Sequence, residues 1–147
     1  MKIFLASDHA GFALKEFINY YLTNLGYNIE DCGAYDMNPI DDYPDFIIPV
    51  ARKVARNLDA RGIIMGGSGQ GEAIAANRIN GVRAAVYYGG PTDIVRLSRS
   101  HNNANILSFG ARFISNEKAA EAMKLWLNQP FEGGRHQKRI DKLDINE

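Results

Sequence analysis

The 147-residue chain lacks features that define several whole classes of protein. Its single cysteine, Cys32, cannot form an internal disulfide, and nothing in the sequence points to an oxidising compartment. Its 17 Lys and Arg residues balance 17 Asp and Glu residues, which argues against a broad nucleic-acid-binding surface. The opening apolar stretch, residues 2–6, is too short for a signal peptide, and no run reaches membrane-spanning length. We therefore expect a cytoplasmic protein with no membrane or nucleic-acid partner.

Patterns that bind metals or nucleotides are also missing. The three histidines, His9, His101 and His136, do not combine with Cys32 into the spacing of a zinc site. The glycine-rich loop 66–71 is followed by Glu72, where a P-loop would need Lys and a dinucleotide fingerprint a third Gly. The sequence therefore predicts no metal site, and the loop does not match a nucleotide site.

Short apolar runs alternate with amphipathic helical patterns along the whole chain. Such alternation with short connections predicts parallel strands joined by right-handed crossovers. We expect one α/β domain over residues 1–147, a doubly wound, Rossmann-like sheet of five parallel strands with helices on both faces and a C-terminal helix. The expected strands are 2–6, 27–32, 62–65, 82–87 and 106–108. The expected helices begin before Leu14, before Ile47, after Gly71 (ending at Ile79), at Pro91, after Ser115 and near Arg135 (ending at Leu143).

In doubly wound sheets a ligand binds at the carboxyl ends of the strands, near the switch in strand order. That rule selects Asp8 and His9 after the first strand and the loop 66–71 after the third. It also selects residues 87–90 and 110–112 after the last two strands. Most of the chemically reactive side chains fall in these segments, so we expect the site there.

The glycine-rich loop favours a bound anion. Its four glycines allow close backbone approach, and successive N–H groups before a helix N-terminus form a concavity for negative charge. Glu72 would repel a pyrophosphate, so the loop suits an anion that forms beside a base, such as an enediolate. Glu72 shares a helical face with Ala75, Ala76 and Ile79. It is either a base that removes a proton next to a carbonyl, or a charge that complements the helix dipole.

The other polar residues each allow a functional and a structural interpretation. Ser68 is either a plain loop hydroxyl or a donor to the developing oxyanion. Asp8 either bonds the nearby backbone in a turn or serves the site, and His101 is a helix-terminal imidazole or an acid–base group. Arg135 and Arg139, four residues apart, form a solvated face or a phosphate site. Arg112, at a strand end, is the more favourable anion contact.

Taken together, the motifs resemble the ribose-5-phosphate isomerase B family, which includes galactose- and allose-6-phosphate isomerases. The resemblance runs from Met1 to about Leu143. The residues that carry it are Asp8-His9-Ala10-Gly11, Asp42-Tyr43-Pro44, Gly66-Gly67-Ser68-Gly69-Gln70-Gly71-Glu72 with Ile74-Ala75-Ala76-Asn77, His101-Asn102-Asn103-Ala104 and Gly134-Arg135-His136-Gln137-Lys138-Arg139-Ile140-Asp141.

One position departs from many family members. Those members carry a cysteine base where this chain has Gly66, whereas another branch uses a glutamate at the end of the loop. The resemblance therefore implies that Glu72 is the base. It also implies a cofactor-free enzyme, with sites shared between two subunits of a homodimer, and the sequence does not decide whether dimers pair into tetramers.

The resemblance further implies a role for each site residue. Gly67, Ser68, Gly69, Gln70 and Gly71 would hold the enediolate, with Ser68 touching its oxygen. His101 and Asp8 would open the furanose ring, Asn102 would bind substrate, and Tyr43 would line the pocket. The phosphate would meet His9, Arg112, Arg135 and Arg139.

The expected reaction is interconversion of ribose 5-phosphate and ribulose 5-phosphate through a cis-enediolate. The same apparatus would also fit allose or galactose 6-phosphate, or a tetrulose 4-phosphate. Two alternatives of another class are a flavodoxin-like nucleotide- or flavin-binding module and a sugar-phosphate sensor that binds without turnover.

Overall fold

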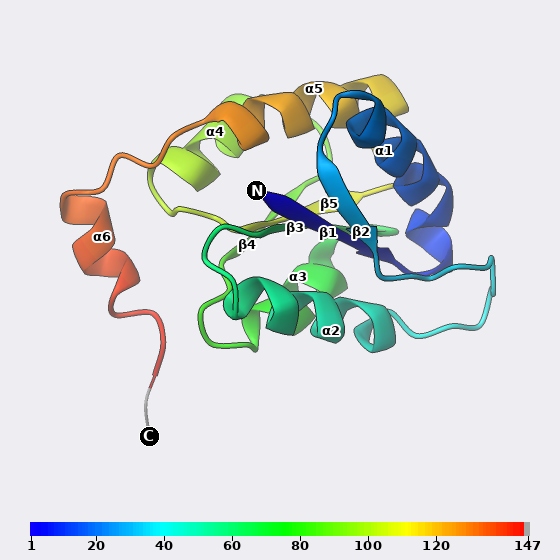
Figure 1. The fold of residues 1–147 in the computed structure, drawn as a ribbon, viewed down its shortest axis with the longest axis horizontal. Coiled ribbons are helices and arrows are strands. Elements are labelled where there is room, and N and C mark those ends of the chain that lie inside the picture. Colours follow the sequence, from blue (N-terminus) through cyan, green and yellow to red (C-terminus); the bar gives the residue numbers. More distant parts are fainter. Residues whose placement is uncertain (146–147) are drawn as a thin grey trace.

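The computed structural model describes residues 1–145 and contains one five-stranded parallel sheet between two layers of helices (Figure 1). The strands are β1 (Lys2–Ser7), β2 (Asn28–Asp31), β3 (Arg61–Gly66), β4 (Ala84–Tyr87) and β5 (Ile106–Gly110). The helices are α1 (Phe12–Asn24), α2 (Pro44–Ala55), α3 (Gln70–Asn77), α4 (Asp93–Ser100), α5 (Asn116–Asn128) and α6 (Arg135–Ile140), with a short 3₁₀ helix η1 (His9–Gly11). The predicted fold class is therefore confirmed.

The two helical layers cover opposite faces of the sheet. Helices α1, α4 and α5 pack on one face, where Ile18, Val95 and Trp126 join one apolar cluster. Helices α2 and α3 pack on the other face, where Val50 and Ala76 join a second cluster. Large side chains buried this fully contribute roughly 1.5–3 kcal/mol each. Helix α6 lies outside both layers, beyond the β4 edge (Figure 1).

Two predicted boundaries differ from the structure around β4. Helix α3 ends at Asn77 rather than Ile79, and β4 begins at Ala84 rather than Val82. The Asn77 side chain accepts from Ala84 N at 2.8 Å and donates to Ala84 O at 3.1 Å. Arg83 N donates instead to the Asn105 side chain at 2.7 Å. Side-chain amides thus satisfy backbone groups that the apolar pattern assigned to a strand.

Strand order places a crevice between β1 and β3. The order is β2-β1-β3-β5-β4, so the chain leaves β1 toward one edge and later returns to β3 on the other side. In parallel sheets such a switch leaves a crevice at the carboxyl ends of the two strands. Asp8 follows β1 and the loop to Glu72 follows β3, so both motifs reach this crevice. Among residues 1–145, no helix combines the length and apolar character needed to cross a bilayer.

Candidate active site

A cavity of about 450 Å³ opens at the carboxyl edge of the sheet. It gathers predicted site residues from four separate segments of the sequence. Those lining it are Asp8, His9, Tyr43, Gly67, Ser68, Gly71, Glu72 and Arg112. The strand-end rule selected three of these four segments, and Tyr43 comes from the end of the loop before α2.

Glu72 lies in the first turn of α3 with only 4% of its surface exposed. The helix begins after Gly69, whose φ of 78° is a left-handed conformation that suits glycine. A side-chain carbon at Gly66 would overlap Oε1 of Glu72 and come within 2.8 Å of Oε2. The carboxylate thus occupies the space next to the backbone that any side chain at position 66 would need.

Burial changes the proton affinity of Glu72. The pKa of Glu72 is raised above 4.5, mainly because burial penalises the charged carboxylate, and the charge of Asp8 adds to the shift. A hydrogen bond from its own backbone partly offsets this. A carboxylate with a raised pKa accepts a proton more readily than a solvated one, as a general base requires.

Asp8 has the turn geometry that the structural interpretation described. Its Oδ1 accepts hydrogen bonds from Ala10 N at 3.0 Å and Gly11 N at 3.2 Å, and 7% of the residue is exposed. A side-chain carbon at Gly11 would lie 2.5 Å from Met65 O, so glycine allows η1 to pack against the end of β3. Asp8 is therefore fixed in place at the cavity wall.

A buried carboxylate holds the ring of His9. Asp41 Oδ1 lies 2.6 Å from His9 Nδ1 and accepts from His9 N at 3.0 Å. The Asp41 side chain is 7% exposed, which keeps this pair largely out of water. Asp41 is not among the predicted site residues. Its place directly before the Asp42-Tyr43-Pro44 motif was the one available signal.

The remaining cavity walls bring a cation and an aromatic ring to the glycine loop. Arg112 N donates to Gly67 O at 3.1 Å, and a side-chain carbon at Gly67 would lie 3.1 Å from Arg112 Nη1. A side-chain carbon at Gly71 would lie 2.8 Å from the Tyr43 ring. Ser68 Oγ accepts from Gln70 N at 3.3 Å. These close approaches shape a cradle with one guanidinium at its rim, a chemistry that suits an anion.

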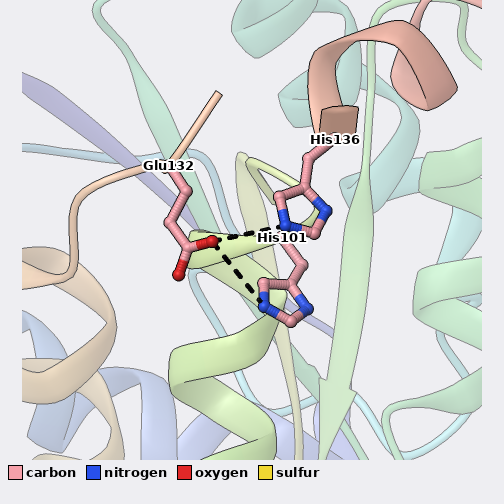
Figure 2. Close-up of side chains that lie close together, drawn as sticks. All are labelled: His101, Glu132 and His136. Atoms are coloured by element: carbon pink, nitrogen blue, oxygen red, sulfur yellow. Dashed lines mark ion pairs between the residues drawn. The ribbon is translucent and has the colours of Figure 1, made fainter. Parts of the chain in front are cut away.

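A second cluster lies elsewhere, in a cavity of about 210 Å³ lined by His101, Asn102, His136 and Arg139. Figure 2 shows the rings of His101 and His136 beside each other, both facing Glu132. The rings stack with centroids 4.2 Å apart, and Glu132 Oε2 lies 3.3 Å from His136 Nε2 and 3.9 Å from His101 Nε2. Burial, together with the nearby charges of His101 and Arg135, lowers the pKa of His136, whereas Glu132 opposes the shift.

The Glu72 cavity and the second cluster lie at opposite ends of the strands, at the carboxyl edge and the amino edge of the sheet. Helix α4 follows the carboxyl end of β4 and runs back, so His101 at its C-terminus reaches the amino edge. There Ala104 N donates to Ser98 O, and Asn105 O accepts from Gly62 N at the start of β3. Glu72 lies at the carboxyl edge, so a single chain does not bring His101 to it.

Three predicted site residues line neither cavity. Gly69 is buried beneath the loop, where its carbonyl accepts from Ser108 Oγ at 2.6 Å, and Gln70 is exposed. Arg135 is exposed at the first residue of α6. Glu132 and His136, which complete the second cluster, were not predicted as site residues.

Within residues 1–145, two groups of side chains could hold a metal by proximity alone. The donor atoms of His101, Glu132 and His136 lie within 4.8 Å of one another, and so do those of Asp8, His9 and Asp41. An ion bound by Asp8, His9 and Asp41 would displace the His9–Asp41 hydrogen bond. An ion bound by His101, Glu132 and His136 would displace the His136–Glu132 ion pair drawn in Figure 2.

The fold and the candidate site together indicate a class of protein. A doubly wound α/β protein with a buried carboxylate beside an anion cradle, at the switch point of its sheet, suits proton transfer on a small anionic substrate. The Ribose/Galactose Isomerase family model matches residues 3–143, so the chain belongs to that family.

Individual relatives agree with the family model. A probable ribose-5-phosphate isomerase B of Mycoplasma genitalium is 42% identical over 96% of this chain and 92% of its own length. The crystal structure of ribose-5-phosphate isomerase B from that organism with bound ribulose-5-phosphate superposes with a TM-score of 0.92 at 41% identity, over 97% of this chain and 93% of that one. The Thermotoga maritima enzyme superposes with a TM-score of 0.91 at 45% identity, over 97% of both chains.

Proposed function

We propose that this protein interconverts ribose 5-phosphate and ribulose 5-phosphate, with Glu72 as the base. The observation that carries the proposal is the buried Glu72 carboxylate beside the glycine loop at the switch point. Relatives named ribose-5-phosphate isomerase B, at about 40% identity over nearly the whole chain, support the substrate. Location in the cytoplasm stays a prediction from the sequence.

The reaction moves one proton between neighbouring carbons. In the open-chain aldose, Glu72 takes the proton from C2, and the electrons flow toward the C1 carbonyl to give a cis-enediolate. The proton of the C2 hydroxyl moves to the C1 oxygen, and the protonated Glu72 returns its proton to C1 as C2 becomes the ketone carbon. Loop backbone N–H groups from Gly67 to Gly71, with the Ser68 hydroxyl, stabilise the negative oxygen as it forms.

Phosphate binding and ring opening involve the other predicted residues. His9, held by Asp41, and Arg112 face the substrate phosphate from the same cavity as Glu72. Arg139 and Arg135 add positive charge from α6. His101, with Asp8 as its partner, opens the furanose ring: the C1 hydroxyl loses a proton, the bond between C1 and the ring oxygen breaks, and the ring oxygen gains a proton. Asn102 binds the sugar.

This division of labour requires two copies of the chain. Since His101 and Glu72 lie at opposite edges of one sheet, the second copy supplies His101, Asn102 and Arg139 to the first copy's Glu72 cavity. A twofold dimer then forms two equivalent sites. Size measurement in solution distinguishes this dimer from a tetramer.

Mixing two inactive variants tests the shared site. Glu72→Gln and His101→Ala each remove one half of every site, so each homodimer is inactive. In a 1:1 subunit mixture, half of the dimers are heterodimers with one intact site of two, which gives about a quarter of wild-type activity. A mixture as inactive as its components would refute the sharing.

Proton–deuterium exchange at the sugar carbons, followed by NMR, tests the chemistry. Glu72→Gln should retain the fold and sugar-phosphate binding but lose exchange and turnover, and near-wild-type exchange would refute the role of Glu72. Four-, five- and six-carbon phosphates run in parallel identify the preferred substrate. Flavin absorbance or nucleotide stabilisation without exchange would instead support a flavodoxin-like module, and sugar-phosphate binding without exchange a sensor.

A further inference from the structure

Three arginines converge at the amino edge of the sheet, away from the Glu72 cavity. Arg61 is the first residue of β3, Arg83 directly precedes β4, and Arg99 lies in the last turn of α4. All three line a cavity of about 640 Å³ that shares no residue with the Glu72 cavity. Neither the reaction nor the dimer proposed above uses them.

The three guanidinium groups are held by acceptors that lie close to one another in the chain. Arg61 Nη1 donates to Trp126 O at 3.2 Å and Leu127 O at 3.1 Å, at the end of α5. Arg99 Nε donates to Gln129 O at 3.4 Å, two residues further on. Arg99 Nη1 also donates to the Asn103 side chain, at 2.8 Å. Arg83 Nε donates to Asn103 O at 3.0 Å, which closes the cluster.

The three arginines differ from the buried Lys15 in that no carboxylate forms an ion pair with them within residues 1–145. Lys15, fully buried in α1, pairs with Asp31 at 2.7 Å and Glu16 at 3.0 Å. Within residues 1–145, by contrast, none of the three arginines forms an ion pair with a carboxylate. Buried charges in proteins are normally paired or bound to a ligand.

Burial and the mutual repulsion of the three cations both favour a bound anion. Only 6% of Arg99 is exposed, and its pKa is lowered to about 10 by burial first and then by the charges of Arg61 and Arg83. Burial also lowers the pKa of Arg83, and the charge of the Asp144 carboxylate partly opposes this shift from a distance. Asp144 Oδ2 itself accepts a hydrogen bond from Gly81 N at 3.0 Å. An anion in the cavity would relieve the mutual repulsion of the three cations.

We propose that this cavity binds the phosphate group of a small phosphorylated metabolite or free phosphate. The geometry provides the donors, because the Nη2 amino group of each arginine makes no hydrogen bond within residues 1–145. Planar guanidinium forks match phosphate oxygens. The cavity exceeds the volume of one phosphate, and Val54, Ala55 and Leu58 offer an apolar wall to an organic group.

The chain carries its own reporter for this site. Trp126 is the single tryptophan, and the guanidinium carbon of Arg61 lies 5.4 Å from its ring centre. An anion that draws on Arg61 changes the field at the buried indole. Titration with pyrophosphate, inorganic phosphate and adenosine monophosphate, at ionic strength held constant with NaCl, should therefore shift the indole ¹H–¹⁵N resonance and fluorescence saturably.

Matched variants separate this site from the substrate site. Arg61→Gln and Arg83→Gln should each weaken binding at least tenfold, whereas Arg112→Gln, in the Glu72 cavity, should leave the Trp126 response unchanged. Two variants on different elements keep the test valid if one fails to fold. Tighter binding of adenosine monophosphate than of inorganic phosphate would identify an organic ligand, and the reverse a free anion.

Three results would overturn the proposal. The first is no saturable response to any of the three probes. The second is a response that survives both arginine variants, and the third is a shift that rises linearly to the highest concentration, which indicates an adventitious ion only.

Discussion

Replacing Gly66 by Ala should inactivate the enzyme without unfolding it. The new methyl group would overlap the Glu72 carboxylate, which must retreat by more than about 1 Å to reach ordinary contact distance. Gly66 does not have a positive φ, so its backbone conformation also suits alanine. The atoms displaced are the end of a flexible side chain, so we expect the thermal midpoint to change little.

The expected loss is large because the base acts at short range. A misplacement of about 1 Å can cost roughly 10²-fold in rate, equivalent to about 2.7 kcal/mol of activation free energy. Steady-state turnover of ribose 5-phosphate should show this fall in kcat, with KM nearly unchanged because His9 and Arg112 keep their positions.

A double variant tests whether the loss passes through Glu72. If alanine acts by displacing the carboxylate, Gly66→Ala combined with Glu72→Gln should be hardly slower than Glu72→Gln alone. Losses that multiply, or a Gly66→Ala enzyme with wild-type kcat, would refute the reasoning.

Four further predictions concern Glu72, Cys32 and Lys15, three side chains that are shielded from water. The raised pKa of Glu72 should place the acid limb of the kcat–pH profile above pH 4.5, and a flat profile down to that pH would contradict its role as base. The same shift contributes stability below pH 4.5 that is lost as pH rises through the folded-state pKa, so the stability of Glu72→Gln relative to wild type, from urea unfolding, should increase above pH 4.5. Burial raises the pKa of Cys32 to about 11, which keeps the thiol neutral, so Cys32→Ser should retain full turnover; its collapse in a folded protein would indicate a thiol base. Lys15→Met leaves Asp31 without its buried partner and should lower the free energy of unfolding by about 3 kcal/mol, against less than about 1 kcal/mol for the exposed control Glu16→Gln; equal losses would contradict the pairing.

Local patterns predicted most of the fold and most of the residues that line the Glu72 cavity. Apolar runs and helical stripes located every strand and major helix, because burial of one face dictates that periodicity. The boundary errors at Asn77 and Ala84 arose where side-chain amides replace strand hydrogen bonds, which periodicity cannot detect. Asp41 was missed for a similar reason, since its partner His9 is 32 residues away.

The sequence by itself determined a doubly wound α/β chain and an anion-binding loop that ends in a carboxylate, because strand periodicity and glycine spacing are local properties. Only the tertiary structure decided what surrounds each group. It packed the Glu72 carboxylate against Gly66, and it turned α4 back so that His101 faces the opposite edge of the sheet. Those placements depend on strand order and crossover direction, which arise from contacts between residues far apart in the chain.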